Sequence, residues 1–303
     1  MIKKRNIVIT GALGQDGIIL SKLLLKKKFN VFGIVKKSNS NKVKNIDYKK
    51  IDLLDYNKIS KFMDRIHPLC LIHLGSENPN YKELKKKKDF YRNNLIVTKN
   101  LIKYFSLNHI DKKLILVGTS QMYKKSTKII DLKSKFAPIN SYAKFRVDSY
   151  EYMVVKKRKF NSKMTTAILF NHDSMYRKKK FLLPRLINLI KSKNFKKINE
   201  IYQENISGDF SHAEDICYGL YKLIISKKNP DKLIFSSNKK TSINSIIKFL
   251  LKKNKIKMKF KNNNLIKNST PIGDNSHAKK LLKWKMKKTI YTALKELNSL
   301  KKE

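Results

Sequence analysis

The amino-acid sequence predicts an α/β fold: a doubly wound parallel sheet followed by a smaller C-terminal α/β region. Short apolar runs alternate with longer amphipathic segments through the first half of the 303-residue chain. Strand–helix alternation with short joints is typical of a parallel sheet whose two faces are covered by helices, with right-handed crossovers between strands. The hydrophobic fraction of 41% supplies enough apolar residues for a sizeable core.

The first half of the chain contains all but one of the predicted strands. These strands are Asn6–Thr10, Asn30–Val35, Leu69–Leu74, Lys113–Gly118 and Met164–Phe170. Between them, apolar residues recur with a spacing near 3.6, which predicts helices over Asp16–Lys28, Tyr56–Ile66, Phe90–Leu107 and Tyr142–Lys159. We therefore assign residues 1–170 to a first domain that contains the sheet.

The pattern loosens after Phe170. The predicted elements here are a basic loop at Arg177–Lys180, a strand over Leu233–Ser236, and helices over Phe181–Ile190, Glu214–Ser226, Ile243–Lys252, Ala278–Leu282 and Lys288–Leu300. Residues 171–303 are expected to form the smaller region. Part of it, about residues 213–240, is expected to fold back onto the sheet.

The net charge of +48 raises the question of a nucleic-acid partner. The lysines, however, run from Lys3 to Lys302 on nearly every polar face, and arginine is scarce beside lysine. This distribution indicates a chain-wide compositional bias and a solvated lysine surface. We expect no nucleic-acid partner, although the charge should help to collect a polyanionic small molecule.

Other compositional features narrow the class of protein. No apolar run approaches the ~18 residues that a membrane span needs, and Ile7-Val8-Ile9 after the basic start is too short for an export signal. Cys70 and Cys217 lie far apart in apolar runs, so buried free thiols are expected. No cluster has zinc spacing. We expect a cytoplasmic protein with no membrane partner and no metal.

A glycine-rich turn follows the first strand. Gly11, Gly14 and Gly17 stand between Asn6–Thr10 and an apolar helix start. In this context the first glycine allows a tight turn, the second lets the backbone approach a pyrophosphate, and the third lets the helix pack on the strand. The helix N-terminus adds amide donors for the phosphates. The sequence therefore predicts a Rossmann-like, dinucleotide-binding sheet.

The end of the second strand indicates which dinucleotide binds. An NAD site normally places an acid there to hold the ribose 2′-hydroxyl. Here the strand ends in Lys36, Lys37 and Ser38 with no acid, and the lysines can meet a 2′-phosphate. NADP is therefore predicted in preference to NAD.

Two further segments contain residues suited to hydride transfer at a carbinol. Thr119 ends the fourth strand of the list above, and Tyr142 begins a helix with Arg146 one turn later. A tyrosine can serve as the base on the hydroxyl proton when a nearby cation lowers its pKa. A Ser or Thr hydroxyl can steady the oxygen as it becomes a carbonyl.

With these residues in place, the chain resembles the GDP-mannose 4,6-dehydratases of the extended short-chain dehydrogenase/reductase superfamily, almost from end to end. The segments that resemble the family are Gly14-Gln15-Asp16-Gly17, Ile168 through Asn171-His172-Asp173-Ser174, Asp209 through His212-Ala213-Glu214-Asp215, and Gly273-Asp274 through Trp284. The Asn-His-acid-Ser segment is the most specific of them.

The resemblance implies a reaction and roles for individual residues. Hydride leaves C4 of the sugar for a retained NADP, a carboxylate removes the C5 proton, water leaves from C6, and hydride returns to C6. Tyr142 would be the C4 base and Thr119 its hydrogen-bond partner, with Gln121 and Arg146 at the other catalytic positions. The resemblance also implies a homodimer or homotetramer.

The same resemblance places the ligand contacts. The cofactor contacts would be Gly11, Gly14, Gln15, Asp16, Gly17, Lys36, Lys37, Ser38, Asp52, Leu53, Leu74, Tyr142 and Arg146, with Asp52 at the adenine. The sugar-nucleotide contacts would be Ser120, Asn171, His172, Arg177 and Asp209.

The chain departs from the family pattern at three places. Gln121 stands where the family has the glutamate that removes the C5 proton, and a neutral amide cannot accept that proton. Arg146 stands where the family has lysine; it keeps the positive charge but is larger and planar. Ser76-Glu77-Asn78 replaces the usual Ala-Gln-Ser-His, which makes Glu77 a conceivable displaced base, although a solvent-facing loop residue is the simpler interpretation.

Four functions therefore stay open at this point. The first is a sugar-nucleotide 4,6-dehydratase. The second is an NADPH-dependent reductase or an epimerase of a 4-keto nucleotide sugar, which needs no base at position 121. The third is a nucleotide-binding protein without catalysis, and the fourth, a nucleic-acid binder, rests on charge alone. Three remaining side chains are expected to be structural: His73 in the core, His212 as a helix cap or packing residue, and Trp284 as a core anchor.

Overall fold

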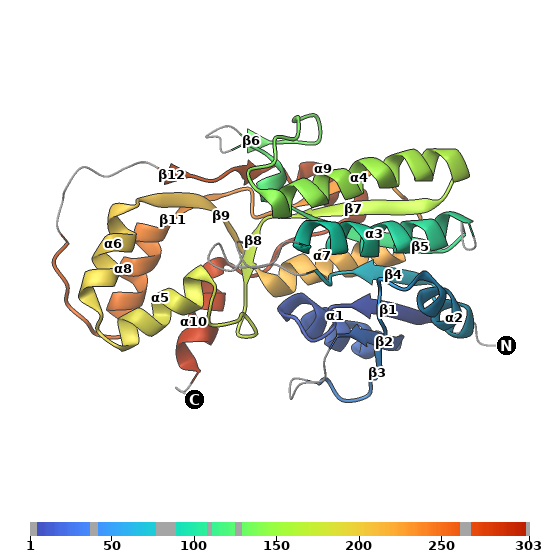
Figure 1. Cartoon of the computed structure of the whole chain (residues 1–303). Helices are drawn as coiled ribbons and strands as arrows, with labels where there is room; N and C mark the ends of the chain where they lie inside the picture. The colour runs from blue at the N-terminus through green and yellow to red at the C-terminus, as the bar shows by residue number, and fades with distance from the viewer. Residues whose placement is uncertain are drawn as a thin grey trace.

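A seven-stranded parallel sheet forms the centre of the molecule (Figure 1). The computed structural model describes residues 5–36, 42–76, 89–107, 111–124, 129–260 and 268–300. The strand order is β10-β7-β5-β4-β1-β2-β3, and every neighbouring pair is parallel. The strands are β1 (Asn6–Thr10), β2 (Asn30–Val35), β3 (Asp47–Lys50), β4 (Cys70–His73), β5 (Lys113–Thr119), β7 (Lys163–Leu169) and β10 (Lys232–Phe235). The predicted doubly wound sheet is confirmed.

Side-chain alternation along the strands explains why helices cover both faces. In β1, Ile7 and Ile9 point to one face and Val8 to the other, and all three are buried. The first face packs against α1 (Gln15–Lys26), α7 (Ala213–Ile225) and α9 (Ser276–Leu282). The second packs against α2 (Tyr56–Ile66), α3 (Phe90–Leu107) and α4 (Ser141–Phe160).

The second region lies beyond the carboxyl ends of the main strands (Figure 1). Four helices enclose its own apolar core: α5 (Leu182–Lys191), α6 (Phe195–Gln203), α8 (Ile243–Lys253) and α10 (Ile290–Ser299). A four-stranded sheet forms its inner side from β8 (Asn171–Asp173), β9 (Ile206–His212), β11 (Lys240–Ser242) and β12 (Asn268–Ser269). A separate two-stranded pair joins β6 (Ile129–Ile130) to β13 (Ile272–Gly273).

One part of the second half belongs to the main sheet. After β9 the chain enters α7, which packs against α1, and then β10, which pairs with β7 in register Lys232↔Thr166. The sheet core therefore contains residues from both halves of the sequence. Both cysteines, Cys70 and Cys217, lie in this core as free thiols, as expected.

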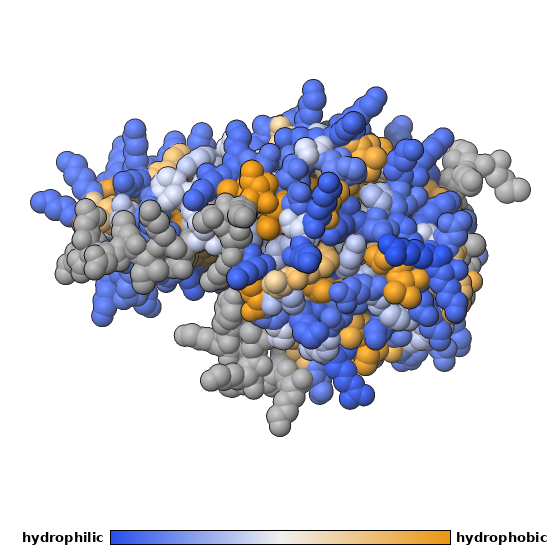
Figure 2. Space-filling model, turned by 90° about the horizontal axis from the view of Figure 1, so that it is seen from above, coloured by the Kyte–Doolittle hydropathy of each residue, from blue (hydrophilic) through white to orange (hydrophobic). Residues whose placement is uncertain are grey.

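The surface agrees with a solvated lysine coat. Figure 2 shows one face on which hydrophilic residues extend over both regions, with apolar patches scattered among them. Among the described helices, none is long and apolar enough to cross a membrane.

Candidate active site

The glycine-rich turn between β1 and α1 leaves open space at one glycine and none at two others. Gly11 has a φ of +70°, which favours glycine. A Cβ at Gly17 would lie 2.5 Å from the carbonyl oxygen of Gly11, so the helix can approach β1 only with glycine here. A Cβ at Gly14 would meet only that same oxygen, at 3.3 Å. This open backbone at the start of α1 fits the pyrophosphate of a dinucleotide.

The end of β4 crosses this turn. A Cβ at Gly11 would lie 2.7 Å from Gly75, and the Gly75 amide donates to the Thr10 hydroxyl at 3.0 Å. The sequence analysis did not select Gly75 or Thr10. A glycine directly after a buried strand, opposite the glycine-rich turn, was the signal that could have indicated Gly75.

His73 fixes this crossing from within the core. Its Nδ1 lies 2.7 Å from the Thr10 hydroxyl, and its Nε2 lies 3.4 Å from the Thr98 hydroxyl. Because Thr98 donates its own proton to the Asn94 carbonyl, it can only accept from Nε2. Nδ1 of the neutral ring then accepts from Thr10, which in turn accepts from Gly75. Burial lowers the pKa of His73 to about 3, which keeps the ring neutral, so this side chain is structural as expected.

Tyr142 and Arg146 lie one turn apart at the start of α4. Asn140 caps the helix by accepting from the Ala143 amide at 2.8 Å, which orients its first turn toward the carboxyl edge of the sheet. An Arg146 Nη2 group donates to the Tyr142 hydroxyl at 3.3 Å and to the Ser76 hydroxyl at 2.7 Å. The arginine is only 3% exposed.

The surroundings of Tyr142 favour its ionised form. Burial by itself would raise the pKa of the phenol. The charge of Arg146, its hydrogen bond and a hydrogen bond from Ser76 outweigh burial, and the more distant Arg177 adds to their effect. The pKa of Tyr142 is therefore lowered from its usual value of 10, as a tyrosine base requires.

Gln121 links the end of β5 to the start of α4. It lies in the single helical turn η2 (Ser120–Met122), which begins directly after Thr119. Asn140 donates its side-chain amide to Oε1 of Gln121 at 2.8 Å, and the Ile139 amide donates to the Gln121 carbonyl. These bonds bring Thr119, Gln121 and Tyr142 to one edge of the sheet. They also occupy the oxygen of Gln121 with a structural contact.

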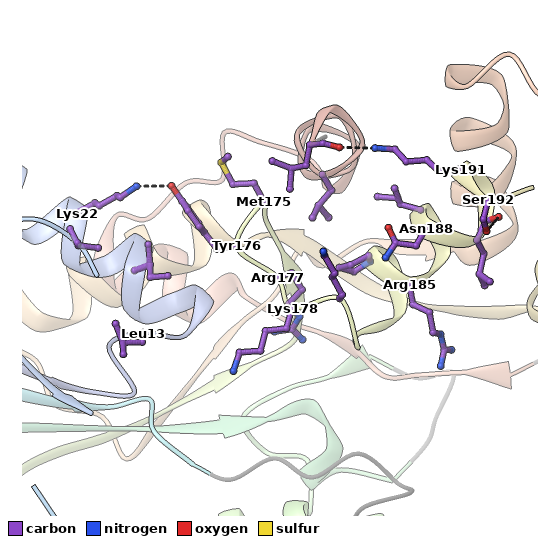
Figure 3. A pocket seen from close by; sticks show the side chains of 18 of the residues that line it. Leu13, Lys22, Met175, Tyr176, Arg177, Lys178, Arg185, Asn188, Lys191 and Ser192 are labelled. Carbon is purple, nitrogen blue, oxygen red and sulfur yellow. Dashed lines mark hydrogen bonds between the residues drawn. The ribbon is translucent and has the colours of Figure 1, made fainter. Parts of the chain in front are cut away.

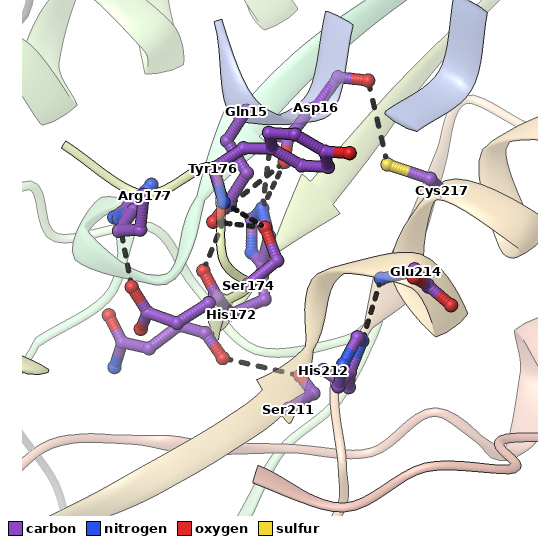
Figure 4. Close-up of polar contacts among 12 residues, drawn as sticks. Gln15, Asp16, His172, Ser174, Tyr176, Arg177, Ser211, His212, Glu214 and Cys217 are labelled. Atoms are coloured by element: carbon purple, nitrogen blue, oxygen red, sulfur yellow. Dashed lines mark hydrogen bonds and ion pairs between the residues drawn. The ribbon is translucent and has the colours of Figure 1, made fainter. Parts of the chain in front are cut away.

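The glycine-rich turn also contacts the second region through side chains (Figure 4). His172 Nε2 lies 3.0 Å from both carboxylate oxygens of Asp16. Gln15 donates to the His172 carbonyl at 3.2 Å and accepts from the Ser174 hydroxyl at 3.1 Å. Gln15 and Asp16, predicted as cofactor contacts, thus hold β8 and the loop after it against α1.

The contacts of His172 favour its protonated form. Its Nδ1 lies 2.6 Å from the Phe170 carbonyl and its Nε2 faces Asp16, so both nitrogens meet acceptors and both must donate. Burial by itself would lower the pKa of His172. The charge of Asp16 and the hydrogen bond between the two residues outweigh burial, so the pKa is raised from its usual value of 6.5. Burial likewise raises the pKa of Asp16, yet His172 and Arg177 bring it down to about 2.

A pocket of about 1000 Å³ opens between the glycine-rich turn and α5 (Figure 3). Leu13 and Ile18 line it on the side of the first region, and α5 lines it on the other. Its cationic lining residues are Lys22, Lys42, Arg177, Lys178, Lys179, Arg185 and Lys191. Arg177 pairs with Asp173 at 3.0 Å and stacks on the Phe181 ring at 3.7 Å, which fixes its direction. The pocket is suited to an anionic ligand with apolar parts.

Comparison with known proteins decides the family. The model of the GDP-mannose 4,6-dehydratase family matches residues 8–297. The chain belongs to the GDP-mannose 4,6-dehydratase family. This match confirms the resemblance and, with it, the prediction of an enzyme of the lyase class.

Curated relatives agree at low identity. GDP-mannose 4,6 dehydratase 2 of Caenorhabditis elegans is 23% identical over 257 residues, covering 78% of this chain and 67% of the relative. GDP-mannose 4,6 dehydratase of Homo sapiens is 23% identical over 269 residues, covering 82% and 72%. Among solved structures, dTDP-glucose 4,6-dehydratase from Bacillus anthracis in complex with NAD has a TM-score of 0.82 at 14% identity, covering 97% and 95%.

A second solved structure has the same fold. UDP-glucuronic acid 4-epimerase from Bacillus cereus in complex with NAD has a TM-score of 0.76 at 20% identity, covering 96% of each chain. The fold is thus shared by dehydratases and epimerases. Membership of the dehydratase family rests on the family model and the curated relatives.

Several predicted ligand residues of this family member have other partners. Asp209 is fully buried, and its carboxylate accepts from the amides of Ser237, Asn238 and Gly273 and from the Ser237 hydroxyl. The Asp209 carboxylate therefore holds loops together. The sequence had predicted a sugar-nucleotide contact at this residue, but the side chain is not exposed to a ligand in this structure. Asp52 accepts from the Leu54 amide in an exposed turn after β3. Lys37, Ser38 and Glu77 lie outside the described residues.

Among the residues that the structure describes, one group of potential metal ligands comes together that sequence spacing did not reveal. His212, Glu214 and Glu296 place ligand atoms within 4.8 Å of one another. Lys288 already supplies a positive charge there, at 2.7 Å from Glu214 and 3.3 Å from Glu296. His212 caps α7 by accepting from the Glu214 amide, as expected, so this group stabilises the α7–α10 contact. Trp284 is buried in the core and donates to the Asp215 carbonyl.

Proposed function

We propose that this protein is an NADP-dependent sugar-nucleotide 4,6-dehydratase that converts GDP-mannose to GDP-4-keto-6-deoxymannose. The observation that carries the proposal is the contact of half-buried Tyr142 with buried Arg146, a hydrogen-bonded pair at the edge of a sheet whose glycine-rich turn fits a dinucleotide. The family match supports the substrate class. Its curated relatives are named for GDP-mannose.

The proposed roles follow from the contacts of each side chain. A bound nicotinamide supplies a group that accepts and returns hydride. Tyr142, as phenolate, takes the proton of the C4 hydroxyl while Arg146 holds the resulting phenol oxygen. Thr119, at the end of β5, donates to the C4 oxygen. Arg177 and the pocket that it lines bind the nucleotide diphosphate. Ser120 in η2, and Asn171 and His172 in β8, are the other proposed contacts with the sugar nucleotide.

The preference for NADP rests on the end of β2. No acid follows this strand at Val35-Lys36, where NAD sites hold the ribose 2′-hydroxyl. The two solved structures named above are complexes with NAD, so they do not support NADP. The proposal of NADP therefore rests on the residues of this chain alone. Dissociation constants for NADPH and NADH, measured by cofactor fluorescence, check the proposal. Tighter binding of NADH would contradict it.

A reductase or epimerase of a 4-keto nucleotide sugar is the second candidate. It is favoured by Gln121, because the amide oxygen is engaged by Asn140 and an amide cannot take a proton from C5. The Tyr142–Arg146 pair alone suffices for proton transfer at C4. Dehydration therefore needs a base from elsewhere, whereas reduction does not.

Two incubations separate these candidates. The protein is incubated with GDP-mannose and NADP, and separately with a GDP-4-keto-6-deoxy sugar and NADPH. Loss of GDP-mannose without net change in NADPH absorbance supports dehydration. Stoichiometric loss of NADPH in the second incubation supports reduction. Binding of both ligands with neither reaction would contradict both candidates and favour a non-catalytic family member.

The Gln121→Glu variant tests the position of the missing base. A carboxylate in η2 can accept the C5 proton. General bases usually contribute about a hundredfold or more, and a base introduced by substitution is expected to recover at least about tenfold in dehydratase turnover. Product formation from GDP-mannose is the measurement. Gln121→Met, which has similar size but no base, serves as the control and should show no gain. An unchanged rate in a folded, ligand-binding Gln121→Glu protein would contradict this role for position 121.

The setting of the enzyme is also part of the proposal. Free, buried Cys70 and Cys217 agree with a reducing, cytoplasmic environment. We expect an assembly of two or four copies. Light scattering of the purified protein, which gives its mass relative to 35.6 kDa, checks this expectation.

A further inference from the structure

We propose that Ser76 is a positioning residue that, together with Arg146, holds the oxygen of Tyr142 in place as a base. Ser76 is the first residue after Gly75 at the end of β4, and Tyr142 and Arg146 come from α4. The three polar groups therefore meet from two elements far apart in the sequence. The inference rests on Tyr142 acting as the base in the proposed function.

The chemistry of the three groups fixes the direction of each hydrogen bond. A guanidinium has donors only, so Ser76 Oγ must accept from Arg146 Nη2 across their 2.7 Å contact. The hydroxyl proton of Ser76 is then free to point away from Arg146. Tyr142 lies in hydrogen-bond contact with Ser76, and its phenolate can accept that proton. The phenolate thus receives one donor from Arg146 and a second from Ser76.

The distances show why the second donor matters. Arg146 Nη2 lies 3.3 Å from the Tyr142 oxygen, which is long for a charged hydrogen bond, and 2.7 Å from Ser76. The guanidinium also packs against the rings of Tyr142 and Phe145, with its Cζ 5.4 Å and 4.7 Å from their centroids. Ser76, held by its shorter contact with Arg146, therefore supplies the second hydrogen-bond donor to the Tyr142 oxygen.

The backbone beside Ser76 is held rigidly enough for this role. The neighbouring Gly75 amide donates to Thr10, and Thr10 donates to the neutral ring of His73, which is 1% exposed. This chain of bonds joins the end of β4 to β1 and α3. It fixes where the serine enters the site, independently of Arg146.

The test compares the ionisation of Tyr142 in wild-type protein and in Ser76→Ala, both saturated with NADP. Tyrosinate absorbance is followed against pH, and the signal of Tyr142 among the 14 tyrosines is isolated by subtracting the same titration of the matching Tyr142→Phe protein. Loss of the hydroxyl donor is expected to move the Tyr142 transition up by about one pH unit, a tenfold change in ionised fraction on its acid side. Ser76→Thr, which keeps the hydroxyl, should restore most of the wild-type transition.

The pH dependence of turnover separates positioning from general damage. In Ser76→Ala the acid limb of the kcat profile should move up by the same amount, with wild-type turnover regained at high pH. A buried serine one turn beyond Arg146 gives the matched control: Ser149→Ala removes a hydroxyl whose oxygen has no hydrogen-bond partner among the described residues, and should leave both curves unchanged.

Two results would overturn the inference. One is an unshifted Tyr142 transition in Ser76→Ala. The other is a transition shifted equally by Ser76→Ala and Ser76→Thr, which would indicate packing in place of the hydroxyl. If Ser76→Ala does not fold, Ser76→Cys provides a weaker donor of similar size and should give a smaller shift in the same direction. Because the titration needs no turnover, it decides the role of Ser76 even if GDP-mannose proves not to be the substrate.

Discussion

The two sides of the cleft differ in what holds them together. On the side proposed for the cofactor, the arrangement depends on missing atoms: Gly11 and Gly17 allow backbones to meet at distances that no Cβ tolerates, and Gly75 leaves little more room. On the catalytic side, it depends on side chains, since Tyr142, Arg146 and Gln121 are placed by hydrogen bonds to one another or to nearby caps. Both sides lie at the carboxyl edge of one sheet.

This difference indicates which parts of the site can change. A glycine that touches backbone has no substitute, whereas a polar side chain can be exchanged when its neighbours adjust. Two residues that depart from the expected family pattern, Arg146 and Gln121, illustrate this. Each has a hydrogen-bond partner close by: Ser76 for Arg146 and Asn140 for Gln121. The cofactor side therefore keeps the family pattern while the catalytic side departs from it.

The largest expected effect is on the catalytic side, from Tyr142→Phe. Removing the phenol removes the proposed base, so turnover should fall by about 10³-fold, within the usual range for acid–base groups. NADPH affinity should change by less than about threefold, or about 0.6 kcal/mol. Steady-state kinetics and cofactor fluorescence give the two quantities.

Tyr123→Phe is the control for Tyr142→Phe. Tyr123 is buried, and its hydroxyl has no hydrogen-bond partner within the described part of the chain, so its removal should leave turnover unchanged. Equal losses in both variants would mean that the effect is general to buried tyrosines. That outcome would remove the chemical distinction between the two sides.

On the cofactor side, Gly17→Ala and Gly14→Ala should differ sharply. The new Cβ at position 17 meets backbone atoms at 2.5–2.7 Å, which should lower the free energy of unfolding by about 3 kcal/mol. Gly14 has a φ of −81°, which alanine adopts readily, and meets only one atom at 3.3 Å. Its variant should keep its stability but bind NADPH at least about tenfold more weakly, because the Cβ enters the space of the pyrophosphate. Denaturant unfolding and fluorescence titration distinguish the pair; equal stability of both variants would refute the packing argument.

The smallest expected effect concerns the contact between Asp16 and His172, which joins the two regions. Asp16→Asn should lower the free energy of unfolding by about 2 kcal/mol, the usual value for a hydrogen bond between charged groups. The contribution of Asp16 is present above pH 3.8 and is lost as pH falls toward its folded pKa of about 2. That of His172 is present below pH 6.5 and is lost as pH rises through its raised pKa.

Unfolding of wild type and Asp16→Asn should therefore differ most between pH 3.8 and 6.5. The exposed Asp47, paired with Lys49 on the surface, gives the control variant Asp47→Asn, for which little change is expected at any pH. A difference between wild type and Asp16→Asn that does not shrink as pH falls from 3.8 toward 2 would contradict an ionised Asp16 in this contact.

The sequence predicted the main sheet well because its strands are continuous apolar runs. The ranges of β1, β2, α2 and α3 agree with the prediction at both ends. β3, whose four residues Asp47–Lys50 are polar or half-exposed at the sheet edge, gave no such pattern. β9 was missed for the opposite reason: it buries Ser207, Asp209 and Ser211, whose side chains bond to residues distant in sequence, namely Ser269, the loop at Ser237 and Asn238, and the Asn171 carbonyl, respectively.

The candidate site was predictable only where chemistry follows local spacing. Tyr142 and Arg146 are one helical turn apart, so their contact could be inferred from sequence. Ser76 and Asn140 could not, because their partners lie 70 and 19 residues away. Asp16 was predicted as a cofactor contact because its motif is local, whereas its contact with His172 depends on how the second region is placed.

The position of β10 at the edge of the main sheet affects how the chain must fold during synthesis. β7 leaves the ribosome before β8, α5, α6, β9 and α7, and its outer edge stays unpaired until Lys232–Phe235 has been made. Unpaired strand edges with apolar neighbours favour association between chains. A fragment that ends at residue 170 should therefore aggregate, as light scattering would show, so the first half depends on the later half for its solubility.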